Sequence, residues 1–208
     1  MNIPPKWKII HTSKNIKDPI RATCRAPNGK IQYIYHPLWI SLSKLLKFKK
    51  LLKMCKKIKD FKLEKKKDVK DDMIQNMIDL VFKTCIRIGN EETGTLLSEH
   101  VGLVSLTHKH LHFKNKKVFL IFIGKSGIKH NIEVNDKNNI KFLTKCYKNK
   151  GDIYLFKYQC PSKGKSVRIT SNDVNNYIKD LWGKEYSCKD IRTYQANIQL
   201  IKELMTLK

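Results

Sequence analysis

Three basic residues lie in settings from which they could converge on one phosphate group. Arg192 belongs to the run KDIRTY at 189–194, Arg87 follows an apolar helical stripe, and Lys125 stands in a Gly-Lys-Ser-Gly turn. A guanidinium group can bind two phosphate oxygens at once, and preset cations stabilise the charge that gathers on a phosphate under nucleophilic attack. The three residues therefore predict a site for phosphate chemistry.

The run at 189–194 lies where a helix should begin. Ser187 and Asp190, three residues apart, indicate a capping box at its start. The free N–H groups of a helix N-terminus favour an anion. Lys189 and Arg192 in the first turns oppose the helix dipole, and a shared phosphate would explain their positions.

Two further elements should position Arg87 and Lys125. Apolar residues at helical spacing predict a helix over 72–88, with Arg87 projecting from its last turn. Strand patterns cover 101–106, 118–123 and 128–134, and a tight turn at 124–127 should place Lys125 at a hairpin tip.

A separate short strand is predicted at 31–35, after the turn signal Pro-Asn-Gly. Gln32, Tyr33 and Tyr35 lie together there beside Lys30, where they could contact a phosphate backbone or base edges. An ordinary hairpin with tyrosines on one face is the alternative. Helices are further predicted over 38–58 and from a cap at Thr170 or Ser171 to Gly183.

The composition favours a polyanionic partner. Lys and Arg number 43 against 18 Asp and Glu, a net charge of +25 in 208 residues. Such an excess destabilises a compact chain unless an anion absorbs it, so nucleic acid is the predicted partner, with biased base composition as the alternative explanation. No apolar run approaches the roughly 20 residues of a membrane span, and no signal peptide opens the chain, so we expect an intracellular, DNA-associated protein.

The six cysteines are scattered, without a Cys-x-x-Cys pair or a histidine at zinc-finger spacing. In an intracellular chain, such cysteines are usually small apolar core residues. We therefore expect no metal, no disulfide and no cofactor.

Six segments in order give the chain a resemblance to the small type IB DNA topoisomerases of poxviruses, giant viruses and some bacteria. They are IPPKW at 3–7, QYIYHPLW at 32–39, IRIGNEE at 86–92, VGL at 101–103, FIGK at 122–125 and KDIRTY at 189–194. The resemblance implies an α+β fold: a mainly helical catalytic domain with a small three-stranded antiparallel sheet, like type IB topoisomerases and tyrosine recombinases.

The resemblance also implies roles for individual residues. A tyrosine of the enzyme attacks double-stranded DNA and forms a 3′-phosphotyrosyl link, without a metal or cofactor, before the strand swivels and is resealed. Arg87 and Arg192 match the family's two catalytic arginines, and Lys125 matches its general acid. Gln32, Tyr33 and Tyr35 match DNA-contacting positions, and Lys189 is a further candidate contact.

The chain departs from the family pattern at several points. The family's histidine segment and nucleophilic tyrosine are expected beyond Lys208, and its small N-terminal β domain before the IPPKW segment. Tyr194 matches a tyrosine of the arginine motif and not the nucleophile, and Thr93 replaces a frequent DNA-contacting tyrosine. We therefore expect a β/turn segment at 1–37, a catalytic core at 38–208 truncated at its C-terminus, and no nucleophile in this chain. A separate chain is a candidate carrier of the missing segment.

Two other protein classes remain open from the sequence. One is a non-catalytic DNA-binding module that kept the basic residues and lost the nucleophile. The other is a tyrosine recombinase, which shares the fold and the two arginines. Recombinases usually place a histidine three residues before the second arginine, where this chain has Lys189, so this class ranks lowest.

Overall fold

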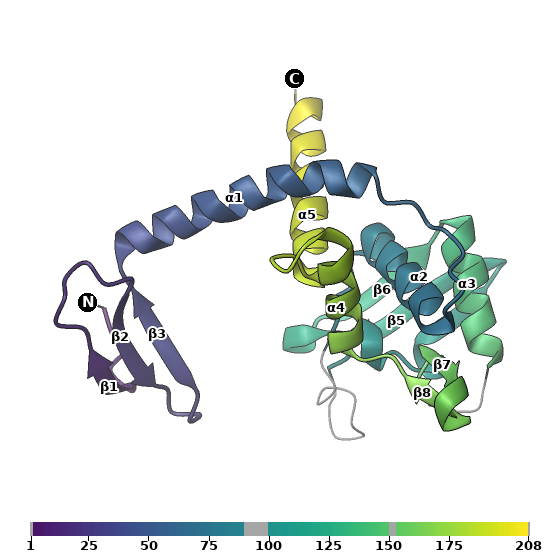
Figure 1. Ribbon diagram of the computed structural model, residues 1–208, viewed down its shortest axis with the longest axis horizontal. Helices are drawn as coiled ribbons and strands as arrows, with labels where there is room; N and C mark the ends of the chain where they lie inside the picture. The colour runs from purple at the N-terminus through teal and green to yellow at the C-terminus, as the bar shows by residue number, and fades with distance from the viewer. Residues whose placement is uncertain (1, 90–99, 150–152, 208) are drawn as a thin grey trace. The chain divides into compact units, whose positions relative to one another are not determined.

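The computed structural model describes residues 2–89, 100–149 and 153–207 (Figure 1). The chain forms two compact units, Met1–Lys56 and Lys57–Lys208, which divide inside the first helix. The sequence places a boundary near residue 37, and a catalytic core that begins there stays a prediction.

The first unit is built on a three-stranded antiparallel sheet. Its strands β1 (Lys8–Thr12), β2 (Ile20–Arg25) and β3 (Ile31–Tyr35) pair in chain order. Ala22 and Cys24, two positions apart on one face of the central strand, are fully buried. The strand predicted at 31–35 is confirmed. Helix α1 (Pro37–Lys59) follows and confirms the helix predicted over 38–58.

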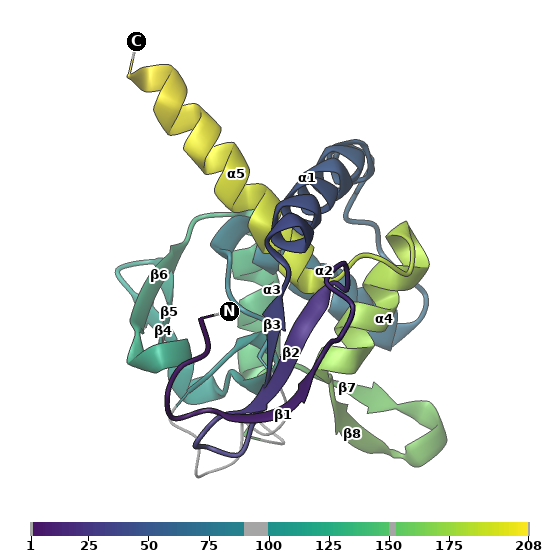
Figure 2. The same ribbon diagram turned by 90° about the vertical axis from the view of Figure 1, so that its left-hand side faces the viewer.

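The second unit is organised around helix α2 (Val69–Thr84). This helix contacts three other helices and strands of two sheets, and its apolar stripe is almost fully buried. The elements around it are β4 (Leu111–Lys114), β5 (Lys117–Ile123), β6 (Lys129–Val134), α3 (Lys137–Lys148), β7 (Lys157–Cys160), β8 (Lys165–Arg168), α4 (Ser171–Trp182) and α5 (Cys188–Thr206). Figure 2 shows the same elements from the side.

Two small sheets flank the helices of this unit. Strands β4, β5 and β6 form an antiparallel sheet in that order, and β7 pairs with β8. The predicted α+β class, mainly helical with a small three-stranded sheet, is therefore confirmed. None of the helices in the described ranges is long and apolar enough to cross a membrane.

The helix caps follow the sequence signals closely. Thr170 caps α4 and accepts a hydrogen bond from the backbone N–H of Asp173, and Gly183 ends that helix. At the start of α5, the N–H and hydroxyl of Ser187 both donate to the carboxylate of Asp190, at 2.9 and 2.8 Å. These contacts lie within four residues, which is why the sequence predicts them.

Two predicted elements differ from the structure. The helix expected over 72–88 ends at Thr84, because Cys85 takes a left-handed conformation with φ of 55°. The strand expected over 101–106 is absent, and Leu103–Ser105 forms a single 3₁₀ turn. The third strand of the sheet is instead β4, which the sequence analysis did not anticipate. Long-range hydrogen bonds described below account for both differences.

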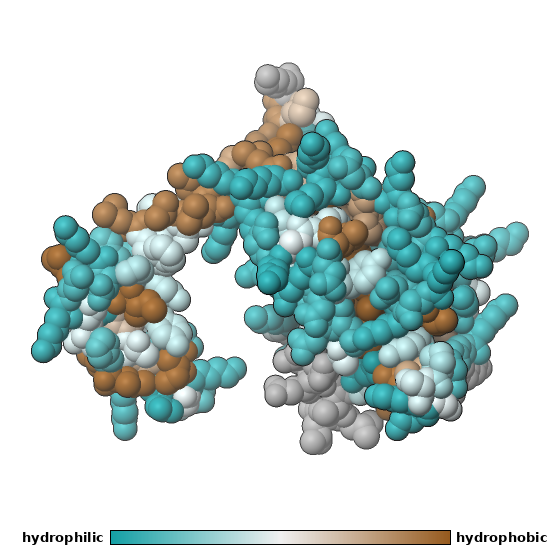
Figure 3. Space-filling model, in the orientation of Figure 1, coloured by the Kyte–Doolittle hydropathy of each residue, from teal (hydrophilic) through white to brown (hydrophobic). Residues whose placement is uncertain are grey.

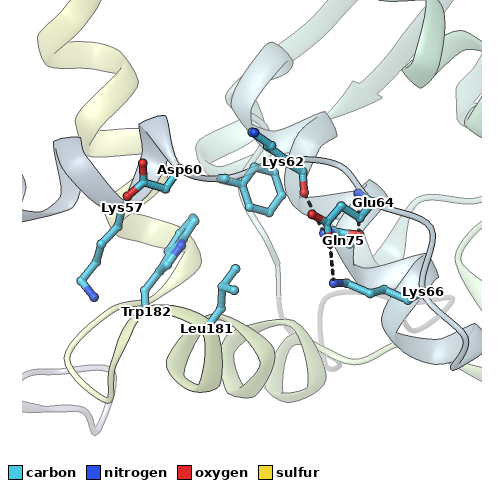
Figure 4. A pocket seen from close by; sticks show the side chains of 9 residues that line it. Lys57, Asp60, Lys62, Glu64, Lys66, Gln75, Leu181 and Trp182 are labelled. Carbon is cyan, nitrogen blue, oxygen red and sulfur yellow. Dashed lines mark hydrogen bonds and ion pairs between the residues drawn. The ribbon is translucent and has the colours of Figure 1, made fainter.

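The loop that precedes α2 packs onto it through polar contacts. Gln75 of α2 is buried, donates to the carbonyl of Lys62 at 3.0 Å and accepts from the N–H of Glu64 at 3.3 Å (Figure 4). Nearby, the ring of Phe61 lies 5.9 Å from that of Trp182. These residues border an open cavity of about 340 Å³. None of the predicted site residues lines it, and the hydrogen bonds of Gln75 hold the loop on α2.

Hydrophilic and hydrophobic residues are unevenly distributed over the surface. Hydrophilic side chains cover most of the visible face of the second unit, and hydrophobic ones gather along α1 (Figure 3). Helix α5 extends beyond the other elements of its unit (Figures 1 and 2), and the apolar side chains of its last turns are exposed. The apolar stripe of α5 is therefore buried only in its first half.

Candidate nucleic-acid phosphate site

Arg87 lies in an extended segment just beyond the end of α2. The N–H of Cys85 donates to the carbonyl of Val81 at 2.9 Å and closes the helix, and its left-handed conformation turns the chain away from the helix axis. Ile86 is buried, whereas the side chain of Arg87 is exposed. The structure corrects the prediction that Arg87 projects from the last helical turn, since the helix has already ended at Thr84.

Two glycines allow a second segment to cross directly against Arg87. A Cβ on Gly102 would lie 2.4 Å from the Cα of Gly89 and 2.9 Å from the carbonyl oxygen of Arg87. Because only glycine avoids this clash, the two backbones approach closely enough to hydrogen bond. The N–H of Leu103 donates to the carbonyl of Arg87 at 2.7 Å, and the N–H of Val104 to that of Ile88 at 3.0 Å.

Arg192 reaches the same place from the second turn of α5. Its Nε donates to the carbonyl of Cys85 at 2.6 Å. One turn further, Gln195 donates to the carbonyl of Phe82 at 2.9 Å. Both contacts satisfy carbonyl groups at the C-terminal end of α2, where a cation also complements the helix dipole. The backbone residue that Arg192 contacts, Cys85, is only two positions before Arg87.

The charges of the two arginines influence each other. Burial lowers the pKa of Arg192, and the neighbouring charge of Arg87 lowers it further. None of the carboxylates in the described ranges forms an ion pair with either guanidinium. Two neighbouring cations without a carboxylate repel each other until an anion lies between them. We call this part of the molecule, with Cys85, Gly89 and Gly102, the arginine corner.

Lys125 is connected to the arginine corner through the backbone. The N–H of Val101 donates to the carbonyl of Ile123 at 2.7 Å, so the segment that crosses Arg87 also pairs with the end of β5. Lys125 follows two residues later in the predicted turn, which is confirmed: the N–H of Gly124 donates to the carbonyl of Ile128 at 2.7 Å. Ser126 and Gly127 have φ of 67° and 73°. We call Gly124–Gly127 the lysine turn.

The side chain of Lys125 is exposed at the tip of this turn, and none of the described carboxylates pairs with it. Packing favours glycine at position 124, because a Cβ there would lie 2.6 Å from Nε2 of His130. That imidazole stacks on Phe122 with ring centroids 4.8 Å apart. The base of the turn is therefore packed, whereas its tip is free to reach an anion.

Lys189 lies in the first turn of α5, exposed and one helical turn before Arg192. Residues three apart on a helix share a face. Lys189 therefore adds a cation on the same side of α5, and no carboxylate in the described part of the chain pairs with it. The cations of this part of the molecule together favour an anion.

The predicted DNA-contacting residues of the first unit lie on β3. Tyr33 and Tyr35 are 48% and 41% exposed on one face, with ring centroids 6.3 Å apart. Gln32 lies on the opposite face and is half-buried. The strand thus presents two neighbouring aromatic rings, tilted by 41° to each other, to solvent, and the amide of Gln32 does not share their face.

Some predicted motif positions fall outside the described residues. These are Asn90, Glu91 and Glu92 of the segment after Arg87, and also Thr93. Tyr194 is half-buried in α5, two residues beyond Arg192.

Sequence reasoning missed three residues that shape the arginine corner. Gly89 and Gly102 stood in the quoted motifs, but only as pattern matches, and no local signal pairs two glycines 13 positions apart. Cys85 was assigned to the apolar stripe of a helix. Its left-handed conformation has no local signal, because cysteine rarely adopts it.

Comparison with known proteins identifies the family. The model of the family described as eukaryotic DNA topoisomerase I, catalytic core, matches residues 40–208. The chain belongs to this family, which confirms the type IB topoisomerase resemblance of its motifs. DNA topoisomerase 1B of Acanthamoeba polyphaga mimivirus is 28% identical over 215 residues, covering 99% of this chain and 63% of that protein. The chain thus spans less than two thirds of this curated relative.

Solved structures of XerH site-specific recombinase bound to difH substrate are more distant. The pre-cleavage complex matches with a TM-score of 0.43 and 14% identity, over 74% of this chain and 42% of that one. The post-cleavage complex on palindromic difH gives 0.43 and 15%, over 74% and 41%. Likenesses of this size support no statement about function.

Proposed function

We propose that this chain supplies the DNA-binding and phosphate-holding part of a type IB DNA topoisomerase. The overall reaction would break one strand of double-stranded DNA through a 3′-phosphotyrosyl link, allow it to swivel and reseal it. Membership of the family supports this proposal, and so does the net charge of +25.

The observation that carries the proposal is that Arg192 bonds the backbone just beyond α2, two residues before Arg87, and that none of the carboxylates in the described ranges pairs with either arginine. In this proposal the two guanidinium groups hold the non-bridging oxygens of the scissile phosphate. The side chain of Arg192 and the backbone that carries Arg87 are held before DNA arrives, because Arg192 is hydrogen bonded to Cys85 and the backbone of Arg87 to Leu103. Preset donors stabilise developing charge without the cost of reorganisation.

Lys125 is proposed as the general acid that protonates the leaving 5′-oxygen. An acid must approach the leaving group as the bond breaks, and the exposed tip of the lysine turn leaves that side chain unrestrained. Lys189 is proposed as a further phosphate contact, and Gln32, Tyr33 and Tyr35 as DNA contacts of the first unit. The nucleophilic tyrosine is proposed to lie outside residues 1–208, and a separate chain is one candidate source.

Binding to duplex DNA tests the first part of the proposal. Fluorescence anisotropy with a labelled 24-base-pair duplex should show affinity that falls steeply with salt, because each neutralised phosphate contributes about 0.9 to the log–log slope. Binding that does not depend on salt, or equal affinity for an uncharged peptide nucleic acid duplex, would contradict it.

Cleavage assays test the second part. The chain should bind a nicked suicide duplex and supercoiled plasmid without a covalent adduct and without relaxation. An adduct would show that a tyrosine of this chain, such as Tyr194, is the nucleophile, and would overturn the proposed division of roles. The same assay separates the two remaining classes: a non-catalytic module gives no adduct under any condition, whereas a catalytic part gains activity when the tyrosine-bearing segment is supplied.

A further inference from the structure

Arg168 ends strand β8 and reaches the turn that carries the arginine corner. Its Nε donates to the carbonyl of Val104 at 3.1 Å. Its guanidinium lies over the ring of Tyr154, with Cζ 3.7 Å from the ring centroid. Val104 is 1% exposed and Arg168 is half-buried, so this hydrogen bond is partly shielded from solvent.

The same turn holds the backbone of Arg87 on its other side. Leu103 donates to Arg87, and Val104 donates to Ile88. Val104 is therefore the shared residue: its N–H fixes the segment that presents Arg87, and its carbonyl is fixed by Arg168. The Leu103–Ser105 turn lies between an exposed arginine and a largely buried one.

The state of the Arg168 guanidinium argues against a purely space-filling role. One of its terminal nitrogens is buried without a hydrogen-bond partner among the described residues. A buried donor without a partner is destabilising, and an apolar side chain of similar length would fill the same volume without that cost. What an apolar side chain could not supply is the directed bond to Val104 and the cation over Tyr154.

We propose that Arg168 is a positioning residue that clamps the Leu103–Ser105 turn and thereby holds Arg87 beside Arg192. It does not touch the phosphate itself. The consequence for anion binding rests on the proposed function of the arginine corner. The clamp on the turn does not, and the two can be tested separately.

Amide hydrogen exchange tests the clamp without any ligand. Arg168→Met keeps the side-chain length and removes the donor and the charge, so the amides of Leu103 and Val104 should exchange at least about tenfold faster than in the wild type. Arg168→Lys retains a donor and a cation over Tyr154 and should stay within about 1.5-fold of the wild type. Lys165→Met, at the exposed start of the same strand, is the matched control and should change neither amide.

Tungstate, a tetrahedral oxyanion, tests the consequence for the arginine corner. Its binding can be followed by NMR through the Nε–H signals of Arg87 and Arg192. Arg168→Met should weaken tungstate binding at least about fivefold, and Arg168→Lys should restore it to within about twofold. If tungstate does not shift the Arg87 and Arg192 signals of the wild-type protein, the proposed phosphate site is wrong. The hydrogen-exchange result would still test the clamp.

The clamp is overturned if Arg168→Met leaves exchange at Leu103 and Val104 unchanged. If Arg168→Met speeds exchange at Leu103 and Val104 but leaves tungstate affinity unchanged, the clamp exists but does not position Arg87, and that part of the proposal is overturned. If Arg168→Met fails to fold by circular dichroism, Tyr154→Leu takes its place, because it removes the ring under the guanidinium and leaves the hydrogen bond. About threefold faster exchange at Val104 is then expected, and an unchanged rate overturns the proposal.

Discussion

The arginine corner and the lysine turn present cations by opposite means. At the corner, Arg192 is hydrogen bonded to the carbonyl of Cys85 at the end of α2, and Gly89 and Gly102 allow two backbone segments to approach closely. At the turn, the base is packed against His130, but the tip carries two residues with positive φ and no described partner for Lys125. The difference suits two tasks: groups that stabilise charge work best when fixed, whereas an unrestrained side chain can come within hydrogen-bond reach of a leaving group.

The largest expected effect breaks the corner. Gly102→Ala places a Cβ against the backbone of Gly89 and Arg87, so we expect the free energy of unfolding to fall by about 3 kcal/mol. Denaturation followed by Trp182 fluorescence measures it, with Trp7 and Trp39 replaced by phenylalanine. Gly127→Ala in the lysine turn is the control: nothing lies within 4 Å, and the left-handed conformation should cost only about 1 kcal/mol. Equal losses would remove the contrast between the two regions.

Hydrogen exchange should show the same contrast in the unaltered protein. The amides of Leu103 and Val104 are buried and hydrogen bonded, whereas Ser126 is exposed. After correction for intrinsic rates, we expect the two corner amides to exchange at least about a hundredfold more slowly than the amide of Ser126. Similar protection in both regions would mean that the lysine turn is as fixed as the corner, and the mobile-acid role of Lys125 would lose its basis.

A smaller effect separates the two arginines of the corner. Arg192→Met leaves the carbonyl of Cys85 without its charged donor, so we expect a loss of about 1 kcal/mol in the free energy of unfolding. Arg87→Met should stay within about 0.5 kcal/mol, because its exposed side chain makes no described hydrogen bond and its removal relieves repulsion with Arg192. The same unfolding assay measures both. A larger loss for Arg87→Met would reverse their assignment.

The smallest effect concerns affinity for DNA. Arg87→Ala, Arg192→Ala and Lys125→Ala should each weaken duplex binding by less than about tenfold and lower the salt slope by about one unit, since many lysines share the phosphates. Lys163→Ala, at another exposed turn, is the matched control for Lys125. If one substitution at the corner abolished binding, the corner would be the main DNA anchor and its catalytic assignment would need revision.

Local sequence signals predicted many of the secondary-structure elements. Strand β3, helix α1, the cap of α4 at Thr170 and the capping box of α5 were all predicted, because each depends on residues a few positions apart. The same holds for the lysine turn, whose glycines mark it. Arg87, Lys125 and Arg192 were also named from the sequence, by residue type and motif, although motifs alone placed none of them in space.

The sequence by itself therefore determined the fold class, the family and the candidate cations. Only the tertiary structure decided that α2 ends at Thr84 and that 103–105 is a turn rather than a strand. It also decided that Arg168 bonds the turn that contacts the backbone of Arg87. The physical reason is that these features depend on partners far away in the chain: Arg192 bonds a carbonyl 107 residues before it, and Arg168 one 64 residues before it. No local periodicity encodes a hydrogen bond between segments that meet only when the core has formed.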